Sequence, residues 1–356
     1  MKVLFVEPVS FPTHYDYNTG ILRNFPDNVE VDICALHGYI KKTDINYSRY
    51  YCIPEKMMYR YSIKDKHPQI NLRWKLLNVW LWIKKNVDFS DYDIILFAYT
   101  EAITFSIIMN NIKQKVLYID HEIGSTVANK LKLYFFKHIN PQYKFIAFED
   151  YIKSYLKKIK GFKNDVTVIR FPLPKTDEIE NNICINDNER SNTNFFIFAP
   201  AINNDEEFVQ FLVDNKERIS KNIKIEIKSK LISVNSDNLL VFCDRIANEQ
   251  YKDNLRRCNA ILINYGRNYN FRTSAVFFEA VRYKKPVILC INNTLKYYAQ
   301  KYNEMVWSFN DFEEFLSKQD ELCEFMRKTS SKSFENVMND YTDDVVTKGI
   351  LKALEL

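Results

Sequence analysis

Glycine is scarce in this chain, with six among 356 residues. Collagen-like repeats, glycine-rich linkers and folds built from many tight hairpins all need more glycine, so these architectures are excluded. The few glycines form neither a P-loop nor a G-x-G-x-x-G motif. P-loop kinases and typical dinucleotide-dependent dehydrogenases are therefore disfavoured.

Cysteine pairs at metal-ligand spacing and long apolar runs are also lacking. The seven cysteines are scattered, and several lie in apolar runs such as LLVFCD and PVILCIN, where cysteine acts as a small buried hydrophobe. This usage indicates a reducing, cytoplasmic compartment. No run approaches the roughly 18 apolar residues that span a bilayer, and the start MKVLFVEPVS is typical of a first strand rather than of a signal peptide. We expect a soluble or peripheral protein.

The net charge of +5 is too small to indicate nucleic-acid binding, so no nucleic-acid partner is expected. Lysine and arginine nevertheless alternate with aromatic and aliphatic residues in three segments of the first half, 73–85, 130–138 and 151–163. One interpretation is three amphipathic helices with solvated lysines and buried apolar stripes. The other is a basic, aromatic surface that contacts an anionic membrane.

Short β-rich runs alternate with helix-period stretches along the whole chain. Strands are expected in the first half at 2–7, 29–36, 93–99, 115–120, 144–149 and 166–171, and in the second half at 195–200, 223–229, 239–244, 260–265 and 286–291. Continuous apolar strands separated by helices are typical of a parallel sheet covered on both faces. The sequence therefore predicts an α/β protein with two Rossmann-like, doubly wound domains.

A polar, acidic and Asn-rich stretch without apolar periodicity separates the two halves. We accordingly expect an N-terminal domain over 1–174, a linker over 175–194 and a second domain over 195–335. Helical patterns alone fill 319–353, and the last part, 336–356, is expected to be a helix that packs back on the first domain.

The loop after the expected strand at 260–265 has the residues of an anion site. It contains Arg267 and Arg272, and a helix begins near Thr273 or Ser274, either of which can cap it with a hydroxyl. Free N–H groups in the first turn, the positive end of the helix and two guanidinium groups suit a phosphate or diphosphate. The sequence thus makes this loop a candidate binding site.

Glu279 follows one and a half turns further along the same helix. If its carboxylate faces the ligand, it could accept hydrogen bonds from a ribose diol. An ordinary buried helix, with an incidental cap and a solvated Glu279, is the alternative interpretation of these residues.

Two motifs in residues 244–287 resemble the donor-binding half of the GT-B glycosyltransferases, especially the retaining group that uses nucleotide-diphosphate sugars. The first is NEQYKDNLRRCNAILI, which has the form E-Y-x-x-L-x-x-A-D before a strand; the second is SAVFFEAVRYKKPVI, which has the form S-x-x-x-x-E-A-x-x-x-x-K/G-P-V-I. The resemblance implies two Rossmann-like domains that face a central cleft, with C-terminal helices crossing back to the first domain. It also implies a hexosyl-type transferase that needs neither a metal nor a cofactor beyond its nucleotide-sugar co-substrate.

Carried over residue by residue, the resemblance assigns Glu279 to the ribose hydroxyls. It assigns Ser274, with neighbouring backbone amides, to the distal phosphate, and it places Arg245 and Ile246 beside the nucleobase. His121, which follows the strand KVLYID, falls where similar enzymes place a histidine against the donor sugar. A strand-end histidine with satisfied hydrogen bonds is the alternative for His121.

The sequence departs from the family at three places. Phe271 stands where the retaining enzymes have the first of two glutamates eight residues apart. The loop at 199–208 is acidic where the family has an arginine and a lysine, so Arg267 and Arg272 would have to neutralise the diphosphate. The family's Gly-Gly loop after the first strand is replaced by SFPTHYDYNTG, with Gly20 alone.

A reaction that inverts the anomeric centre needs a base to take the acceptor proton. His14 and Asp16, in the loop after the first strand, are the candidates, with Glu101 and Glu122 behind them. If the configuration is retained, no protein base is obligatory and His14 would line the acceptor site. A histidine of an ordinary surface loop is the alternative for His14.

Three functions remain open at this point. The first is an active glycosyltransferase with a UDP-linked donor and a saccharide or lipid-linked acceptor, which builds bacterial surface polysaccharide or glycolipid at the inner face of the plasma membrane. The second is a binding protein with the same fold and a decayed donor site. The third is a nucleotide-sugar epimerase of the same architecture, which needs no acceptor.

Overall fold

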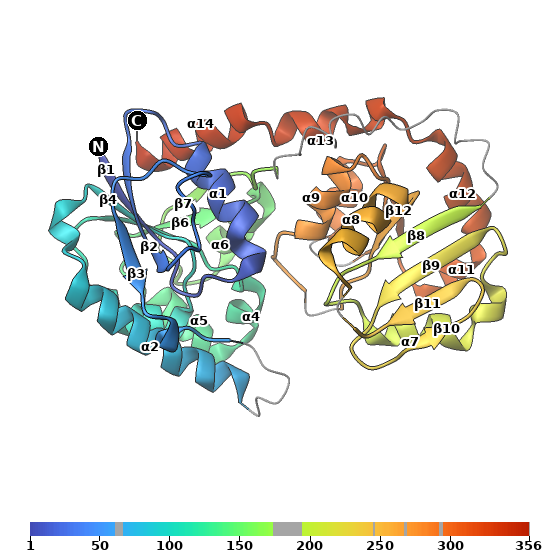
Figure 1. Ribbon diagram of the computed structural model, residues 1–356, viewed down its shortest axis with the longest axis horizontal. Helices are drawn as coiled ribbons and strands as arrows, with labels where there is room; N and C mark the ends of the chain where they lie inside the picture. The colour runs from blue at the N-terminus through green and yellow to red at the C-terminus, as the bar shows by residue number, and fades with distance from the viewer. Residues whose placement is uncertain (61–66, 174–193, 245, 267–268, 292–294, 356) are drawn as a thin grey trace. The chain divides into compact units, whose positions relative to one another are not determined.

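The computed structural model describes residues 1–60, 67–173, 194–244, 246–266, 269–291 and 295–355. The chain forms two compact units (Figure 1). The N-terminal unit comprises Met1–Pro172 and Tyr341–Leu356, and the C-terminal unit comprises Leu173–Asp340. The linker expected over 175–194 lies, except for its last residue, outside the described residues.

The N-terminal unit is built on a seven-stranded, wholly parallel sheet of order β3-β2-β1-β4-β5-β6-β7. Its strands are β1 (Lys2–Val6), β2 (Glu30–Leu36), β3 (Tyr50–Ile53), β4 (Ile94–Phe97), β5 (Lys115–Tyr118), β6 (Lys144–Ala147) and β7 (Val166–Val168). Central strands such as β4 are buried along their whole length, because helices cover both faces. The strand order reverses between β1 and β4, which makes the carboxyl ends of these strands the expected ligand edge.

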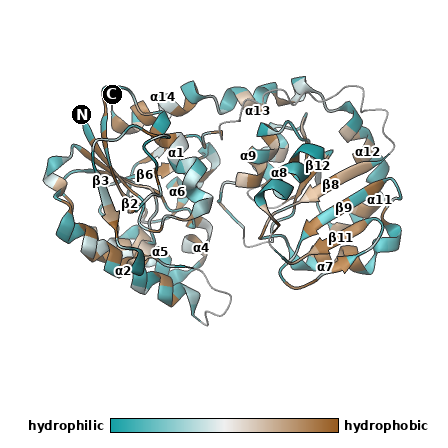
Figure 2. Ribbon diagram, in the orientation of Figure 1, coloured by the Kyte–Doolittle hydropathy of each residue, from teal (hydrophilic) through white to brown (hydrophobic). Residues whose placement is uncertain are grey.

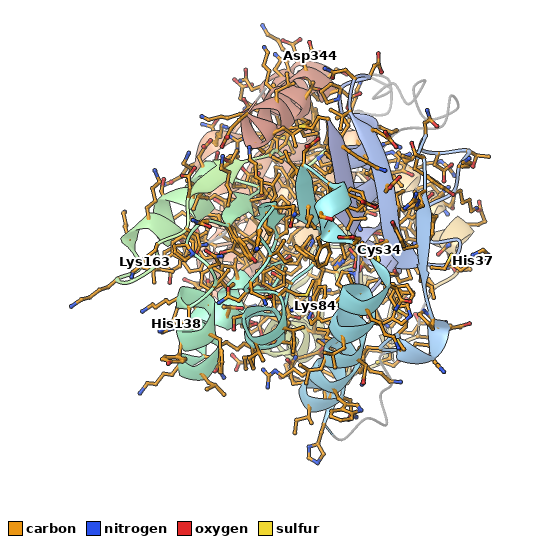
Figure 3. All side chains as sticks on the ribbon, turned by 90° about the vertical axis from the view of Figure 1, so that its left-hand side faces the viewer. Cys34, His37, Lys84, His138, Lys163 and Asp344 are labelled. Carbon is orange, nitrogen blue, oxygen red and sulfur yellow. The ribbon has the colours of Figure 1, made fainter. Side chains whose placement is uncertain are left out.

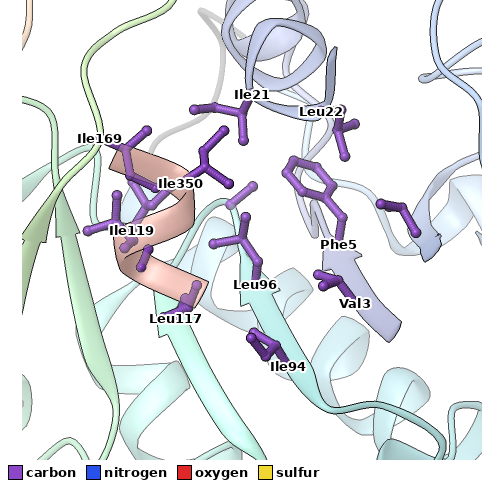
Figure 4. Packing of buried hydrophobic residues seen from close by; sticks show 14 of the residues in the cluster. Val3, Phe5, Ile21, Leu22, Ile94, Leu96, Leu117, Ile119, Ile169 and Ile350 are labelled. Carbon is purple, nitrogen blue, oxygen red and sulfur yellow. The ribbon is translucent and has the colours of Figure 1, made fainter. Parts of the chain in front are cut away.

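Two sets of helices cover this sheet. The α-helices of this unit are α1 (Tyr15–Arg23), α2 (Pro68–Asn86), α3 (Ala102–Ile108), α4 (Ile123–Ala128), α5 (Lys130–Lys137), α6 (Asp150–Lys158) and α14 (Asp343–Leu354). Short 3-10 turns are η1 (Pro12–His14), η2 (Glu55–Met57) and η3 (Phe89–Asp91). On one face, α1 and α14 pack through Ile21 and Ile350 against Phe5 and Leu96 (Figure 4). On the other, ring contacts hold α2, α3 and α5, for example Trp80 on α2 with Phe97 on β4 at 5.7 Å.

The last helix, α14, approaches the sheet closely at Gly349. A Cβ atom at this position would lie 2.9 Å from the carbonyl oxygen of Val168 and 3.1 Å from Cα of Ile169. Only glycine allows this backbone contact, so Gly349 seats α14 on the end of β7. The hydroxyl of Thr342 caps the helix by accepting from the amide of Val345 at 3.3 Å.

The C-terminal unit repeats this plan with a sheet of order β10-β11-β9-β8-β12-β13-β14. Its strands are β8 (Phe195–Ala199), β9 (Ile223–Lys228), β10 (Val234–Asn235), β11 (Leu239–Phe242), β12 (Ala260–Ile263), β13 (Val287–Cys290) and β14 (Val306–Phe309). All pairs are parallel except β10 with β11. The strand order of this sheet reverses between β8 and β12. In both units, hydrophobic residues concentrate in the strands (Figure 2).

The helical elements of this unit are α7 (Glu206–Asp214), η6 (Lys216–Arg218), α8 (Asn248–Arg257), α9 (Ala275–Arg282), α10 (Leu295–Lys301), α11 (Phe312–Ser317), α12 (Gln319–Lys328), η7 (Ser331–Phe334) and α13 (Glu335–Asp340). The predicted fold class, two doubly wound α/β domains, is thus confirmed. Within the described ranges, no helix has both the length and the apolar character needed to cross a membrane.

Candidate functional site

The carboxyl ends of β1, β4 and β5 gather aromatic and titratable side chains at one edge of the N-terminal sheet. After β1 the chain turns through Ser10, whose φ of 48° lies in the left-handed region, and then enters η1, which ends at His14. Tyr99 follows β4 and His121 follows β5. Because the strands are parallel and adjacent, these three side chains lie together, with the His14 and Tyr99 ring centroids 5.7 Å apart.

Glu7 is a residue of this cluster that the sequence interpretation missed. Its side chain is fully buried, and its carboxylate accepts hydrogen bonds from the amides of Val9 at 3.1 Å and Ser10 at 3.0 Å, and from Nδ2 of Asn18 at 2.8 Å. A glutamate directly after an apolar strand, at the reversal of strand order, is the signal that could have identified it. Three N–H donors fix the position of this carboxylate.

His14 lies against this buried carboxylate. Its Nδ1 atom is 3.7 Å from Oε2 of Glu7 and has no hydrogen-bond partner among the described residues. The ring stacks on His121, with centroids 4.3 Å apart and an interplanar angle of 17°, and the side chain is 14% exposed. The imidazole thus lies beside a buried carboxylate without a hydrogen bond to it and stays partly open to solvent, which makes His14 a candidate general base.

His121 is more firmly engaged in the fold. Its Nε2 lies 2.9 Å from the carbonyl oxygen of Ala98, and a carbonyl only accepts, so Nε2 carries the proton of this bond. The ring is stacked with Tyr99 and meets Tyr17 edge-on at 5.6 Å. These contacts fix the tautomer and the plane of the ring that supports His14.

The other carboxylates named from the sequence lie apart from His14 or have partners. Asp16 is exposed in the first turn of α1. Glu101 caps α3 through the amide of Thr104 at 3.0 Å and pairs with Nε of Arg73 at 2.9 Å. In the part of the chain that the structure describes, no group of three or more His, Cys, Asp or Glu side chains could hold a metal ion.

Asp120, which precedes His121, is a second buried carboxyl group at this edge. It accepts from the hydroxyl of Thr126 at 2.6 Å and from the amide of Glu122 at 2.7 Å. Burial nevertheless dominates and raises the pKa of Asp120 from its ordinary value of 3.8 to about 7. The folded protein therefore binds a proton here more tightly than the unfolded chain does.

Replacing Asp120 by asparagine is expected to remove a loss of stability that the wild type undergoes as the pH rises toward neutrality. In the wild type the free energy of unfolding should fall as the pH rises from about 4 to about 7, by up to about 4 kcal/mol. Asparagine keeps an acceptor for Thr126 and has no proton to lose. Urea denaturation at pH 5 and pH 8 measures this difference, with Asp165→Asn, at an exposed carboxylate, as the control. If the free energy of unfolding changed between pH 5 and pH 8 by the same amount in Asp120→Asn and in the wild type, the raised pKa of Asp120 would be contradicted.

In the C-terminal unit, Ser274 rather than Thr273 caps α9. Its hydroxyl accepts from the amide of Phe277 at 3.1 Å and lies 2.9 Å from the hydroxyl of Tyr265, and the whole residue is buried. The Ser274 side chain therefore fixes where the helix begins. The next residue, Ala275, is exposed, and first-turn amides have no partner within their own helix, so the backbone is what this helix end offers to an anion.

The loop before α9 is ordered by aromatic stacking. The rings of Tyr265 and Tyr269 lie 3.9 Å apart, and the hydroxyl of Tyr269 donates to the carbonyl of Thr273 at 2.9 Å. The guanidinium of Arg272 lies over the Tyr269 ring at 5.6 Å, next to Phe271, whose φ is 56°. This packing holds the Arg272 guanidinium over the Tyr269 ring within the loop that precedes α9.

Two buried polar groups at this edge have no hydrogen-bond partner among the described residues. Both amide atoms of Asn264, at the end of β12, and the hydroxyl of Thr273 make no hydrogen bond with any described residue. Asn264 is fully buried, and buried polar groups are almost always satisfied by protein, water or ligand. The sequence interpretation missed Asn264, which a strand-end position at the reversal of strand order could have indicated.

Glu279 is held by a tyrosine of the preceding helix. Its Oε2 accepts from the hydroxyl of Tyr251 on α8 at 2.5 Å, and Glu279 is half-buried. Burial, followed by the Glu279 charge, raises the pKa of Tyr251 well above its ordinary value, so the tyrosine stays a donor. Among the other predicted donor-site residues, Ile246 is half-buried between β11 and α8, while Arg245 and Arg267 lie outside the described residues.

The acidic loop at 199–208 has a structural explanation. Asp205 caps α7 by accepting from the amide of Glu207 at 3.1 Å, and Glu206 accepts from the hydroxyl of Ser229 and the amide of Lys230. These bonds bring exposed Lys230 beside the loop, with its Nζ 3.4 Å from Oδ1 of Asn203. A cation from the loop after β9 therefore lies beside the acidic loop, a candidate that the sequence interpretation missed.

No family model and no curated protein sequence matches the chain. Solved structures do match over its whole length. Anabaena Alr3699/HepE in complex with UDP has a TM-score of 0.64 at 13% identity and covers 100% of both chains. Trehalose-6-phosphate synthase OtsA has a TM-score of 0.64 at 10% identity, covering 100% of this chain and 99% of that one. The lipopolysaccharide outer core galactosyltransferase WaaB has 0.60 at 14%, with coverage of 100% and 99%.

The chain has the GT-B fold. The predicted resemblance to GT-B glycosyltransferases is confirmed at the level of the fold. Each Rossmann-like half of this GT-B chain places a polar cluster at the reversal of its strand order, around His14 in one unit and around the start of α9 in the other.

Proposed function

We propose that this protein is a glycosyltransferase that moves a sugar from a nucleotide-diphosphate donor to an acceptor hydroxyl. The observation that carries the proposal is the start of α9, where an exposed helix end, an arginine and a glutamate one and a half turns later are assembled in a GT-B fold. A diphosphate would accept from the first amides of α9 and from Arg272. Glu279 would accept from the ribose hydroxyls.

In this reaction the acceptor oxygen forms a bond to the anomeric carbon, and the bond from that carbon to the diphosphate breaks. The helix end and Arg272 stabilise the negative charge that builds up on the leaving group, without a metal. In an inverting reaction His14 takes the acceptor proton, and the buried carboxylate of Glu7 lies beside the imidazole, with its Oε2 3.7 Å from Nδ1. A UDP-linked donor is supported by the related fold of HepE, whose structures contain UDP, UDP-glucose and glucose.

The proposed acceptor is a saccharide carried on a lipid, in the synthesis of bacterial surface polysaccharide or glycolipid. The enzyme would then act in the cytoplasm at the inner face of the plasma membrane. Basic residues between apolar ones on the helices of the N-terminal unit support this location.

Calorimetric titration with UDP-, GDP-, ADP- and TDP-sugars tests the proposal, followed by product analysis with saccharide acceptors. Binding of one nucleotide sugar and transfer to an acceptor would support a transferase. Binding without turnover would favour a binding protein with a decayed donor site, in keeping with Phe271 at the place of a glutamate. Release of a free epimer without acceptor would favour an epimerase.

Replacing Glu279 by alanine is expected to weaken nucleotide binding by about 1.5–3 kcal/mol, because a charged hydrogen-bond acceptor for the ribose is lost. Tyr251→Phe, which removes the donor that holds Glu279, should cost less. Titration calorimetry with UDP measures both variants. Glu313→Ala, which removes an exposed partner of Arg218 in the same unit, is the matched control. Unchanged affinity in Glu279→Ala would remove Glu279 from the site.

A further inference from the structure

The longest helix of the N-terminal unit, α2, is apolar on two sides. One side faces the sheet and includes fully buried Trp80 and Ile83. The opposite side carries Ile70, Trp74 and Leu81, which are 62%, 66% and 56% exposed. Their spacings of four and seven residues put them on a single stripe of the helix. A water-facing helix surface is normally polar, so this stripe needs an explanation.

The neighbouring helices α3 and α5 also carry exposed hydrophobic side chains. Six of the ten large hydrophobic side chains exposed among the described residues lie on α2, α3 and α5: Ile70, Trp74, Leu81, Ile107, Leu131 and Tyr134. Nζ of Lys84 on α2 donates to the carbonyl of Ile108 at the end of α3 at 3.0 Å. Asn110, just after α3, donates to the carbonyl of His138, just after α5, at 2.9 Å. We call these six side chains the apolar face.

The apolar face lies on one side of the sheet. Figure 3 shows Lys84 and His138, which mark the ends of α2 and α5, on the side away from Asp344 at the start of α14. Buried rings on the inner sides of α2, α3 and α5 fix this orientation, for example Trp80 with Phe105 and Phe136 with Phe145. The six exposed side chains therefore point away from the core.

The charge on these three helices has one sign. They contain seven lysines and arginines and no aspartate or glutamate. Arg73 and Lys132 form ion pairs with Glu101 and Glu122. The other five, which pair with no carboxylate among the described residues, are Lys75, Lys84, Lys85, Lys130 and Lys137. The apolar face is thus bordered by uncompensated positive charge.

We infer that the apolar face binds to the surface of an anionic lipid bilayer. Isoleucine and leucine side chains would enter the boundary of the acyl region, tryptophan and tyrosine would lie at headgroup depth, and the lysines would meet lipid phosphates. A second copy of the chain fits less well, because two such faces would bring ten uncompensated lysine charges together. The inference deepens the proposed function by assigning the membrane contact to these three helices. It depends on the proposed function only where it explains access to a lipid-linked acceptor.

Sedimentation of the full chain with vesicles, without donor or acceptor, tests the inference. Binding is expected to be at least about tenfold stronger to phosphatidylcholine vesicles that contain phosphatidylglycerol than to phosphatidylcholine alone. Lys85→Gln/Lys130→Gln should weaken that binding about 10–30-fold, and Trp74→Ala/Leu81→Ala at least about tenfold. A blue shift of tryptophan emission on binding should be reduced in Trp74→Phe.

Two controls match these variants. Lys348→Gln/Lys352→Gln removes the same charge from exposed positions of α14, on the other face of the sheet. Leu231→Ser removes from the C-terminal unit a large hydrophobic side chain that is 77% exposed, the highest value in the part of the chain that the structure describes. Both should bind vesicles as the wild type does, and circular dichroism should show that all variants are folded.

The inference would be overturned if the wild type, Lys85→Gln/Lys130→Gln and Trp74→Ala/Leu81→Ala bound vesicles equally. Equal binding of the wild type to neutral and anionic vesicles would also overturn it. A dimer in light scattering that Trp74→Ala/Leu81→Ala dissociates, together with no vesicle binding, would assign the face to a second copy. Vesicle binding without nucleotide-sugar binding would leave this inference standing and remove the proposed function.

Discussion

Replacement of His14 by alanine is expected to lower kcat by about 10²–10⁴-fold and to leave the affinity for the nucleotide sugar unchanged. The imidazole has the geometry to take the acceptor proton, since its Nδ1 lies 3.7 Å from the buried carboxylate of Glu7 and its ring is supported by His121. The residues proposed to bind the donor belong to the other unit, so donor binding should not depend on His14. Single-turnover rates and calorimetry separate the two effects.

His37→Ala, at an exposed histidine of the same unit, is the control and should keep wild-type turnover. Glu7→Gln should lower kcat less than His14→Ala and change the pH profile of kcat, because Glu7 acts through the imidazole. A kcat of His14→Ala within a few-fold of wild type would contradict the assignment. It would favour a retaining reaction, for which no protein base is obligatory.

The sequence was sufficient for the central parts of the fold. Strands such as β4, IILF, are buried on both faces and are therefore continuous apolar runs that stand out in the sequence. The strands that the sequence interpretation missed, β3, β10 and β14, lie at sheet edges and are short or partly exposed. At an edge fewer side chains are buried, so the apolar signal fades.

The helix-period stretch at 126–138 of the sequence predicts a single helix, but the structure has two helices there. The stretch 126–138 contains the end of α4 and all of α5, which are separated at Asn129. This residue has extended backbone, φ −103° and ψ 118°, and its side chain caps α5 by accepting from the amide of Lys132 at 3.0 Å. Hydrophobic periodicity continues across the break because both helices pack on the same unit, so periodicity alone could not reveal it.

The two candidate sites, one around His14 and one at the start of α9, differed in how much of each the sequence could predict. Ser274 as a cap and Glu279 on the same helix follow from a contiguous motif, so spacing was enough to place them together. The cluster of Glu7, His14 and His121 joins the ends of β1 and β5, and more than a hundred residues separate His14 from His121. Such a contact depends on strand order, which local patterns do not contain.

Replacement of Arg170 by methionine is expected to lower the free energy of unfolding by about 3–5 kcal/mol. The Glu149 side chain is fully buried, and it accepts from a guanidinium nitrogen of Arg170 and from the hydroxyl of Tyr341 at 2.6 Å. The second terminal nitrogen of Arg170 pairs with Asp150. Methionine fills a similar volume but removes the positive charge that Arg170 places beside the buried carboxylate, and removing one partner of a buried pair is strongly destabilising.

Urea denaturation followed by tryptophan emission measures this loss, because Trp74, Trp80 and Trp82 belong to the same unit as Arg170. Arg218→Met breaks an exposed pair with Glu313 and should cost under about 1 kcal/mol. Adding Glu149→Gln to Arg170→Met should recover part of the loss, since a neutral amide needs no cation. A loss as small as that of Arg218→Met would contradict the prediction. Tyr341 lies two residues before α14, so its hydrogen bond to Glu149 also ties the returning end of the chain to this ion pair.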